Sequence, residues 1–166
     1  AVTLAFVERD AGGNAKYAFY SEGAADRFYY PSDLPVTLPE SCRFLLVGSI
    51  SLAQEPSGSS ICSLIEREHI ARLVSFDPNI RPNLISDKVR YIERFEWICQ
   101  RSAVVKASDS DLEWLYEMPG RKAAQKVLEI GPELIAFTLG DRGAVLMTKA
   151  RQVEMPAKSV PVVDTI

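Results

Sequence analysis

The sequence predicts an α/β fold with a doubly wound, mostly parallel sheet flanked by helices. Residues 44–138 alternate strand-like and helical segments four times, which is typical of parallel strands joined by crossover helices. Residues 44–47 form a continuous apolar run closed by Gly48, as expected of a strand buried on both faces. Two short strand-like runs at the start of the chain add a small β-hairpin. The 166 residues suffice for one domain with a sizeable core.

The hairpin is predicted from residues 2–8 and 16–20, which are rich in β-branched and aromatic side chains. Residues 10–14 between them contain glycine and asparagine, which tolerate the positive φ of a tight turn. Residues 24–39 show little periodicity and contain three prolines, so they are expected to be a connection.

The alternating region supplies the remaining elements. We expect strands at 44–47, 73–76, 103–105 and 134–138, and helices at 57–71, 86–99, 109–117 and 121–130. The apolar residues at helical spacing in the first two helices are Ile61, Leu64, Ile65 and Ile70, then Val89, Ile92, Phe95 and Ile98. Ser108 is placed to cap the third helix, and Gly131 followed by Pro132 ends the fourth. A second hairpin is expected from 144–148 and 152–155.

Charge and hydropathy exclude several classes of function. The net charge is −3 and the isoelectric point about 5.3, with Lys and Arg scattered along the chain. This leaves no basic surface of the kind that binds nucleic acid or anionic membranes. No stretch approaches the roughly 18 apolar residues of a membrane span, and we expect no signal peptide. Neither nucleic acid nor membrane is therefore an expected partner.

Residues that bind zinc are sparse. Cys42, Cys62 and Cys99 form neither a CxxC pair nor a zinc-binding spacing. His69 is the only histidine and falls among Glu and Arg on a predicted solvated helix face, so zinc catalysis is not expected. Isolated cysteines in odd number favour buried, inert thiols in a reducing compartment, which predicts a cytoplasmic protein.

The loop after the strand at 134–138 reads Thr-Leu-Gly-Asp-Arg-Gly-Ala. Active sites of parallel sheets lie beyond the carboxyl ends of the strands, so this position is a candidate site. Gly140 and Gly143 would let backbone amides approach a phosphate and form an anion-binding nest. The loop lacks the spacing of a Walker motif, and a plain hairpin turn is the competing interpretation.

The loop after the strand at 73–76 carries Asp77, Asn79 and Arg81. A guanidinium suits planar recognition of a carboxylate or phosphate, which makes this a second candidate for ligand binding. In the alternative interpretation, Asp77 and Asn79 satisfy their own turn and Arg81 extends into solvent.

The junction after the strand at 103–105 carries Lys106, Ser108 and Asp111. A helix amino end attracts anions, and a carboxylate there can help to hold hydrated Mg²⁺. Ordinary capping by Ser108 explains the same residues. Asp164 follows an apolar pair near the end of the chain, and it is either a strand-end ligand or simply a terminal aspartate.

The order of these segments resembles the fructokinase branch of the ribokinase-like (PfkB) carbohydrate kinases over essentially the whole chain. SFDPNIR at 75–81 and TLGDRGA at 138–144, in that order, are the most specific matches. The other matching segments are TLAFV at 3–7, FYSEGAAD at 19–26, GSISLAQEP at 48–56, VKASDSDLEWL at 105–115 and VPVVDT at 160–165.

This resemblance implies a ribokinase-like fold and a kinase that transfers phosphate from ATP to a sugar hydroxyl, with Mg²⁺ and a stimulating monovalent cation such as K⁺. The hairpin and its connection, residues 1–35, would form a β lid over the sugar and a surface for homodimerisation. Residues 36–166 would form the central part of the α/β domain, so the chain would be incomplete at both ends.

The resemblance also assigns roles to single residues. Thr138, Gly140 and Gly143 would lie along the nucleotide, with Lys106 and Ser108 beside its phosphates. Asp77, Asn79 and Arg81 would lie near the sugar and the phosphates. Ser108 and Asp111 match the Asn-x-x-Glu pattern that organises magnesium, as shorter variants. Asp164 matches the residue that opens DTxGAGD and helps to bind the monovalent cation.

Two departures from the family pattern bear on function. Ser21 stands where members commonly carry arginine, which affects the sugar contacts of the lid. The printed sequence stops at Ile166, before the GAGD aspartate that serves the family as catalytic base, so we expect the chain alone to be inactive. The expected activity of the intact protein is fructose phosphorylation. The alternatives are a 2-keto-3-deoxygluconate kinase or a non-catalytic nucleotide-binding fragment.

Overall fold

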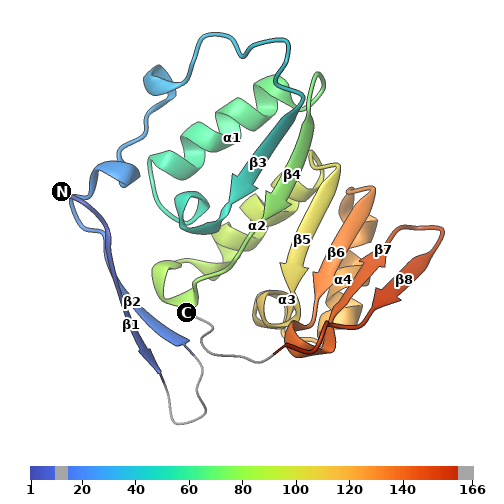
Figure 1. Cartoon of the computed structure of the whole chain (residues 1–166). Coiled ribbons are helices and arrows are strands. Elements are labelled where there is room, and N and C mark those ends of the chain that lie inside the picture. The colour runs from blue at the N-terminus through green and yellow to red at the C-terminus, as the bar shows by residue number, and fades with distance from the viewer. Residues whose placement is uncertain (10–14, 161–166) are drawn as a thin grey trace.

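The computed structural model describes residues 1–9 and 15–160, which form a two-stranded sheet and a six-stranded sheet (Figure 1). The small sheet pairs β1 (Leu4–Arg9) with β2 (Ala15–Tyr20). The large sheet has the order β3-β4-β5-β6-β7-β8. Its strands are β3 (Phe44–Gly48), β4 (Leu73–Asp77), β5 (Val104–Ser108), β6 (Leu134–Thr138), β7 (Ala144–Met147) and β8 (Gln152–Met155).

Strands β3 to β6 are parallel, which confirms the predicted sheet. Helical crossovers connect them: α1 (Ser57–Glu68), α2 (Lys88–Cys99), and the pair α3 (Asp109–Tyr116) and α4 (Gly120–Ile130). The connections into β7 and β8 are short, and both strands therefore pair antiparallel, as the predicted second hairpin requires. The arrowheads of β3 to β6 point to one edge of the sheet, and the β1–β2 hairpin reaches past that edge (Figure 1).

The core lies between the helices and one face of the sheet. Alternate residues of the strands are buried there, because successive side chains of a strand point to opposite faces. Phe76 of β4 and Phe95 of α2 are almost fully buried, with ring centroids 5.3 Å apart. Burying such a side chain contributes about 1.5–3 kcal/mol to the free energy of folding. The residues of the opposite face, such as Leu46 and Leu73, are more exposed.

Two helices differ from the prediction at their ends. Helix α1 ends at Glu68, so Ile70 lies beyond it and is 87% exposed. Helix α2 begins at Lys88 and buries Tyr91, Phe95, Ile98 and Cys99. The predicted Val89 is instead 69% exposed, because it lies off the face that these four residues share.

The hairpin contacts the rest of the chain through a few polar bonds. Gln54 donates a buried hydrogen bond of 2.9 Å to the hydroxyl of Ser21. Asn83 donates to the backbone carbonyl of Tyr17 at 2.8 Å. Much of the hairpin's apolar surface is uncovered, and Phe6 and Tyr20, which contact each other edge to face, are both about 60% exposed. The hairpin is therefore an appendage of the sheet and contributes little to its core.

None of the helices in the part of the chain that the structure describes has the length and apolarity needed to cross a membrane.

Candidate functional site

Four candidate residues lie together at the carboxyl edge of the large sheet. Asp77 ends β4, Lys106 and Ser108 lie on β5, and Thr138 ends β6. The register pairs Ser108 with Thr138, and the alternation of each strand places all four side chains on the face away from the core. The structure thus brings together residues that are up to 61 positions apart in the sequence.

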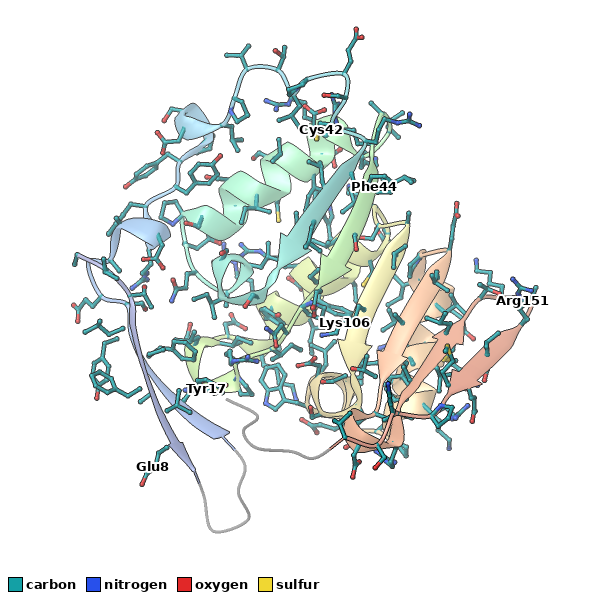
Figure 2. All side chains as sticks on the ribbon, viewed as in Figure 1. Glu8, Tyr17, Cys42, Phe44, Lys106 and Arg151 are labelled. Carbon is teal, nitrogen blue, oxygen red and sulfur yellow. The ribbon has the colours of Figure 1, made fainter. Side chains whose placement is uncertain are left out.

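Lys106 and Asp77 form an ion pair across the ends of β5 and β4. The Lys106 Nζ lies 3.0 Å from one Asp77 oxygen and 3.2 Å from the other. Both side chains are partly exposed, at 41% and 33%. Figure 2 shows Lys106 low on the sheet, toward the edge where the parallel strands end. The pair therefore presents one cation and one carboxylate, held in place but accessible, at the edge where such folds bind ligands.

The first turn of α3 forms a capping box. The hydroxyl of Ser108 accepts a hydrogen bond of 3.1 Å from the backbone N–H of Asp111. Oδ2 of Asp111 accepts in return from the N–H of Ser108 at 3.2 Å. The predicted cap is confirmed, since these bonds satisfy amides that the helix itself leaves unpaired.

The same carboxylate also reaches the neighbouring strand-end loop. Oδ1 of Asp111 accepts a hydrogen bond of 2.8 Å from the backbone N–H of Ile80, and Asp111 is only 8% exposed. Both of its oxygens are thus engaged by backbone amides. No local sequence pattern predicts the Ile80 contact, because it joins residues 31 positions apart.

The loop after β4 has a constrained backbone. Asn79 has a φ of +39°, and Ser49, the residue directly after β3, has a φ of +60°. Asn tolerates this region better than most residues. Ser49 donates its N–H to the carbonyl of Pro78 at 3.1 Å, which joins the ends of β3 and β4. A hollow of about 250 Å³ lies here, lined by Leu46, Val47, Gly48, Ser49, Asp77 and Asn79.

Arg81 turns toward the hairpin. Its Nη1 donates to Oδ1 of Asn79 at 2.9 Å, and its Cζ lies 5.2 Å from the centre of the Tyr17 ring. Figure 2 shows Tyr17 on the hairpin beside the loop that follows β4. Arg81 is partly buried rather than extended into solvent, and it links the strand-end loop to the hairpin.

The glycine loop continues the edge beyond β6. Gly143 has a φ of +98°, and a Cβ on it would lie 2.0 Å from the carbonyl oxygen of Met155, so no larger residue fits without movement. Arg142 pairs with Asp109 of α3 at 2.5 Å, which holds the loop beside the amino end of that helix. Gly140 is exposed, with a φ of +62° and open space around it. The loop therefore adjoins the ends of β5 and β6 and the first turn of α3.

The donor set of this edge suits Mg²⁺ better than zinc. It offers carboxylate and hydroxyl oxygens from Asp77, Ser108 and Asp111, and Mg²⁺ prefers such oxygens together with water. Within residues 1–9 and 15–160, no three His, Cys, Asp or Glu side chains cluster as ligands for a metal ion. A magnesium ion here would therefore keep much of its water. Asp164 lies outside the described residues.

A hollow of about 320 Å³ lies elsewhere, between the start of α2 and the turn that follows β3. Two of its charged side chains, Arg94 and Glu55, pair with each other, and the carboxylate of Asp87 caps α2 by accepting from the backbone N–H of Arg90 at 3.0 Å. Because these groups are satisfied within the protein, we assign no ligand to this hollow.

A family model described as "pfkB family carbohydrate kinase" matches residues 2–166. The chain is 41% identical over 165 residues to a fructokinase of Rhizobium leguminosarum bv. trifolii, covering 99% of this chain and 50% of the relative. It is 30% identical to fructokinase-2 of Solanum lycopersicum, over 98% of this chain and 50% of that protein. The chain spans about half the length of the curated relatives it matches.

Solved structures agree with this result. The fructokinase of Vibrio cholerae O395, determined with fructose, ADP and calcium bound, superimposes with a TM-score of 0.82 at 28% identity, over 97% of this chain and 53% of that one. Aminoimidazole riboside kinase of Salmonella enterica, in complex with its riboside and an ATP analogue, gives a TM-score of 0.77 at 25% identity, over 89% and 50%. From the family match along its whole length and from these relatives, the chain belongs to the pfkB family of carbohydrate kinases.

Proposed function

We propose that the protein carrying this chain transfers a phosphoryl group from ATP to a hydroxyl of fructose. The observation that carries the proposal is the arrangement of Asp77, Lys106, Ser108 and Thr138 in one row, beside a glycine loop, at the carboxyl edge of a parallel sheet. Phosphoryl transfer relies mostly on positioning and on stabilisation of charge, and this edge offers fixed groups for both.

In this proposal the nucleotide lies over the glycine loop. Thr138, Gly140 and Gly143 border it, because glycine allows a close approach of backbone to phosphate. Lys106 and Ser108 face the phosphates, where an ammonium group and a hydroxyl donate hydrogen bonds to phosphate oxygens. When ATP approaches, Lys106 can exchange its contact with Asp77 for the phosphates.

The second strand-end loop serves the acceptor side. Asp77, Asn79 and Arg81 lie near the sugar and the transferred phosphate in our proposal, next to the hollow of about 250 Å³. Arg81 also contacts Tyr17 of the hairpin, so it is placed to link the acceptor site with a lid formed by residues 1–35. A pair of such lids would form the interface of a homodimer.

Magnesium would reach this edge together with the nucleotide. Its function in such a kinase is to neutralise charge that develops on the phosphates. Asp111 would contact it through water, because both carboxylate oxygens already accept backbone N–H groups. Asp164 is our candidate for a monovalent cation such as K⁺, by the sequence resemblance alone.

Fructose is the proposed sugar because two kinds of relative point to it. The Rhizobium relative is a fructokinase, and the Vibrio enzyme was solved with fructose and ADP. We also propose a cytoplasmic location, which agrees with three free cysteines in the described residues.

The test is an ATP-dependent kinase assay on the protein in its full natural length, with fructose, ribose, 2-keto-3-deoxygluconate and nucleosides as acceptors. We expect fructose to give the highest kcat/KM. A preference for 2-keto-3-deoxygluconate would show that the proposed sugar is wrong and that the proposed reaction, phosphoryl transfer from ATP, is right. Nucleotide binding without turnover on any acceptor would contradict the proposal and identify a non-catalytic binding protein.

A further inference from the structure

Asp111 bridges two of the loops that form the candidate site. Its Oδ1 accepts from the N–H of Ile80, in the loop after β4, and its Oδ2 accepts from the N–H of Ser108, at the end of β5. Because Asp111 is 8% exposed, water competes little for these two bonds. One buried carboxylate therefore fixes the separation of two neighbouring strand ends.

The contact with Ile80 matters because of its neighbours. Ile80 lies between Asn79 and Arg81 and is only 6% exposed. Its position is therefore set both by the hydrogen bond of its N–H to Asp111 and by the burial of its side chain. On the other side of the loop, the carbonyl of Pro78 accepts from the N–H of Ser49. Asn79 keeps its φ of +39° between these two anchors, and such a conformation persists only where the surroundings determine it.

The length of the side chain fits this role. An aspartate at the third position of α3 reaches back to the N–H of Ser108 and across to Ile80 with the same carboxylate. The two bonds to this carboxylate measure 2.8 and 3.2 Å, and because the acceptor is charged they set orientation as well as distance. The carboxylate is thus matched to backbone donors on both sides.

We propose that Asp111 is a positioning residue that holds Asn79 and Arg81 at the acceptor side of the site through the Ile80 N–H. This inference rests on the proposed kinase function for its effect on activity, but the bridge itself can be tested without it. Asp111 acts through Ile80, and any contact with magnesium is secondary and passes through water.

The bridge is tested first in the unmodified chain by NMR. We expect a scalar coupling across the hydrogen bond between the Ile80 amide nitrogen and the Asp111 carboxyl carbon, together with slow exchange of the Ile80 amide. Absence of the coupling, with rapid exchange, would overturn the proposal even if the protein proves to be a kinase.

Variants then separate positioning from metal binding. Asp111→Ala should speed exchange of the Ile80 amide at least 10-fold, and Asp111→Asn by less, because its amide oxygen can still accept from Ile80. The matched control is Asp109→Asn, an acid in the same turn that pairs with Arg142, which should change that exchange less than twofold. If Asp111→Ala does not fold, Asp111→Asn and the coupling in the unmodified chain decide the question.

In the full-length protein, Asp111→Ala should lower kcat/KM for the sugar at least 10-fold per folded molecule, and Asp111→Asn should lower it less, because its amide oxygen can still accept from Ile80. The Mg²⁺ concentration for half-maximal rate should stay within threefold. A 10-fold rise in that Mg²⁺ concentration would overturn the proposal and identify Asp111 as a metal ligand. An unchanged kcat/KM would also overturn it, because Asp111 would then only cap α3. If the unmodified protein has no kinase activity, the proposed function fails, and the NMR result still decides the bridge.

Discussion

The ammonium group of Lys106 lies 3.0 Å from Oδ2 of Asp77, so the ends of β5 and β4 are joined by an ion pair on the open face of the sheet. Neither residue belongs to the apolar core, and each is partly exposed. A partly exposed pair of this kind adds little to stability, which is consistent with the proposed role of both residues in ligand binding.

Replacing Lys106 by Met should impair phosphoryl transfer without unfolding the protein. Loss of one preorganised donor typically lowers kcat about 100-fold, and we expect a fall of that order in the full-length enzyme. Steady-state kinetics with ATP as the varied substrate measures it. Lys122→Met, at an exposed position of α4, is the control. Equal activity of the two variants would show that Lys106 does not take part in phosphoryl transfer.

The two glycines of the loop after β6 should respond differently to alanine. Gly140 has open space around it, so Gly140→Ala should lower the free energy of unfolding by about 1 kcal/mol through its φ of +62° alone. At Gly143 the new Cβ would also collide with the Met155 carbonyl, and the loss should reach about 3 kcal/mol. Urea unfolding of both variants tests this, and a larger loss at Gly140 would contradict the loop geometry.

Ser108→Ala should lower the free energy of unfolding by about 1 kcal/mol, because it removes the cap of α3. Ser110→Ala removes only a hydroxyl that lies 3.0 Å from the Ser108 hydroxyl. It leaves the bond from the Asp111 N–H to Ser108 in place, so the change should stay within about 0.5 kcal/mol. Chemical denaturation of both variants gives the comparison. Equal losses would mean that the Ser108 cap contributes nothing of its own.

The stability that depends on Glu55 should fall in acid. Burial raises the pKa of the Glu55 carboxyl, but hydrogen bonds from Arg94 and Ser59 outweigh it and lower the pKa below 4.5. A group whose pKa is lower in the folded state stabilises it above the unfolded pKa and loses this effect as the pH falls through the folded value. The Tm difference between the unmodified chain and Glu55→Gln should therefore be largest above pH 4.5 and shrink below it. Arg94→Met should reduce this pH dependence, because only the hydrogen bond from Ser59 then lowers the pKa of Glu55. A Tm difference between the unmodified chain and Glu55→Gln that stays constant from pH 3 to 7 would contradict the prediction.

Cys42 and Cys99 should differ in reactivity. Burial raises the pKa of the Cys99 thiol well above its usual value, and Glu96 nearby adds to this, whereas Cys42 is only partly buried. Since the thiolate is the nucleophile, iodoacetamide should modify Cys42 in the native protein and Cys99 only after unfolding. Peptide mass spectrometry distinguishes the sites, and early labelling of Cys99 would show that the core opens.

Most of the fold follows from local patterns in the sequence. The strand at Leu134–Thr138 agrees with the prediction residue for residue, because a β-rich run is bounded there by Pro132 and Gly140. The ends of α1 and α2 were predicted less well. Ile70 and Val89 are apolar and near helical spacing, but periodicity alone cannot tell whether a neighbouring element covers them.

The candidate site was predicted in part. The sequence analysis selected Asp77, Lys106, Ser108 and Thr138 because each ends or follows a predicted strand, and the register of a parallel sheet brings such positions together. The bonds from Gln54 to Ser21, from Asn83 to Tyr17 and from Ile80 to Asp111 were not foreseen. Each joins residues 31 or more positions apart, and no local signal marks such a pair.

The sequence by itself determined the alternation of strands and helices, the cap at Ser108 and the order of segments that identifies the family, because these depend on neighbours within a few residues. Only the tertiary structure decided which oxygens and amides meet at the edge of the sheet. There, the separation of β4, β5 and α3 lets one aspartate bind backbone groups of two loops, and that separation is set by the packing of the whole core.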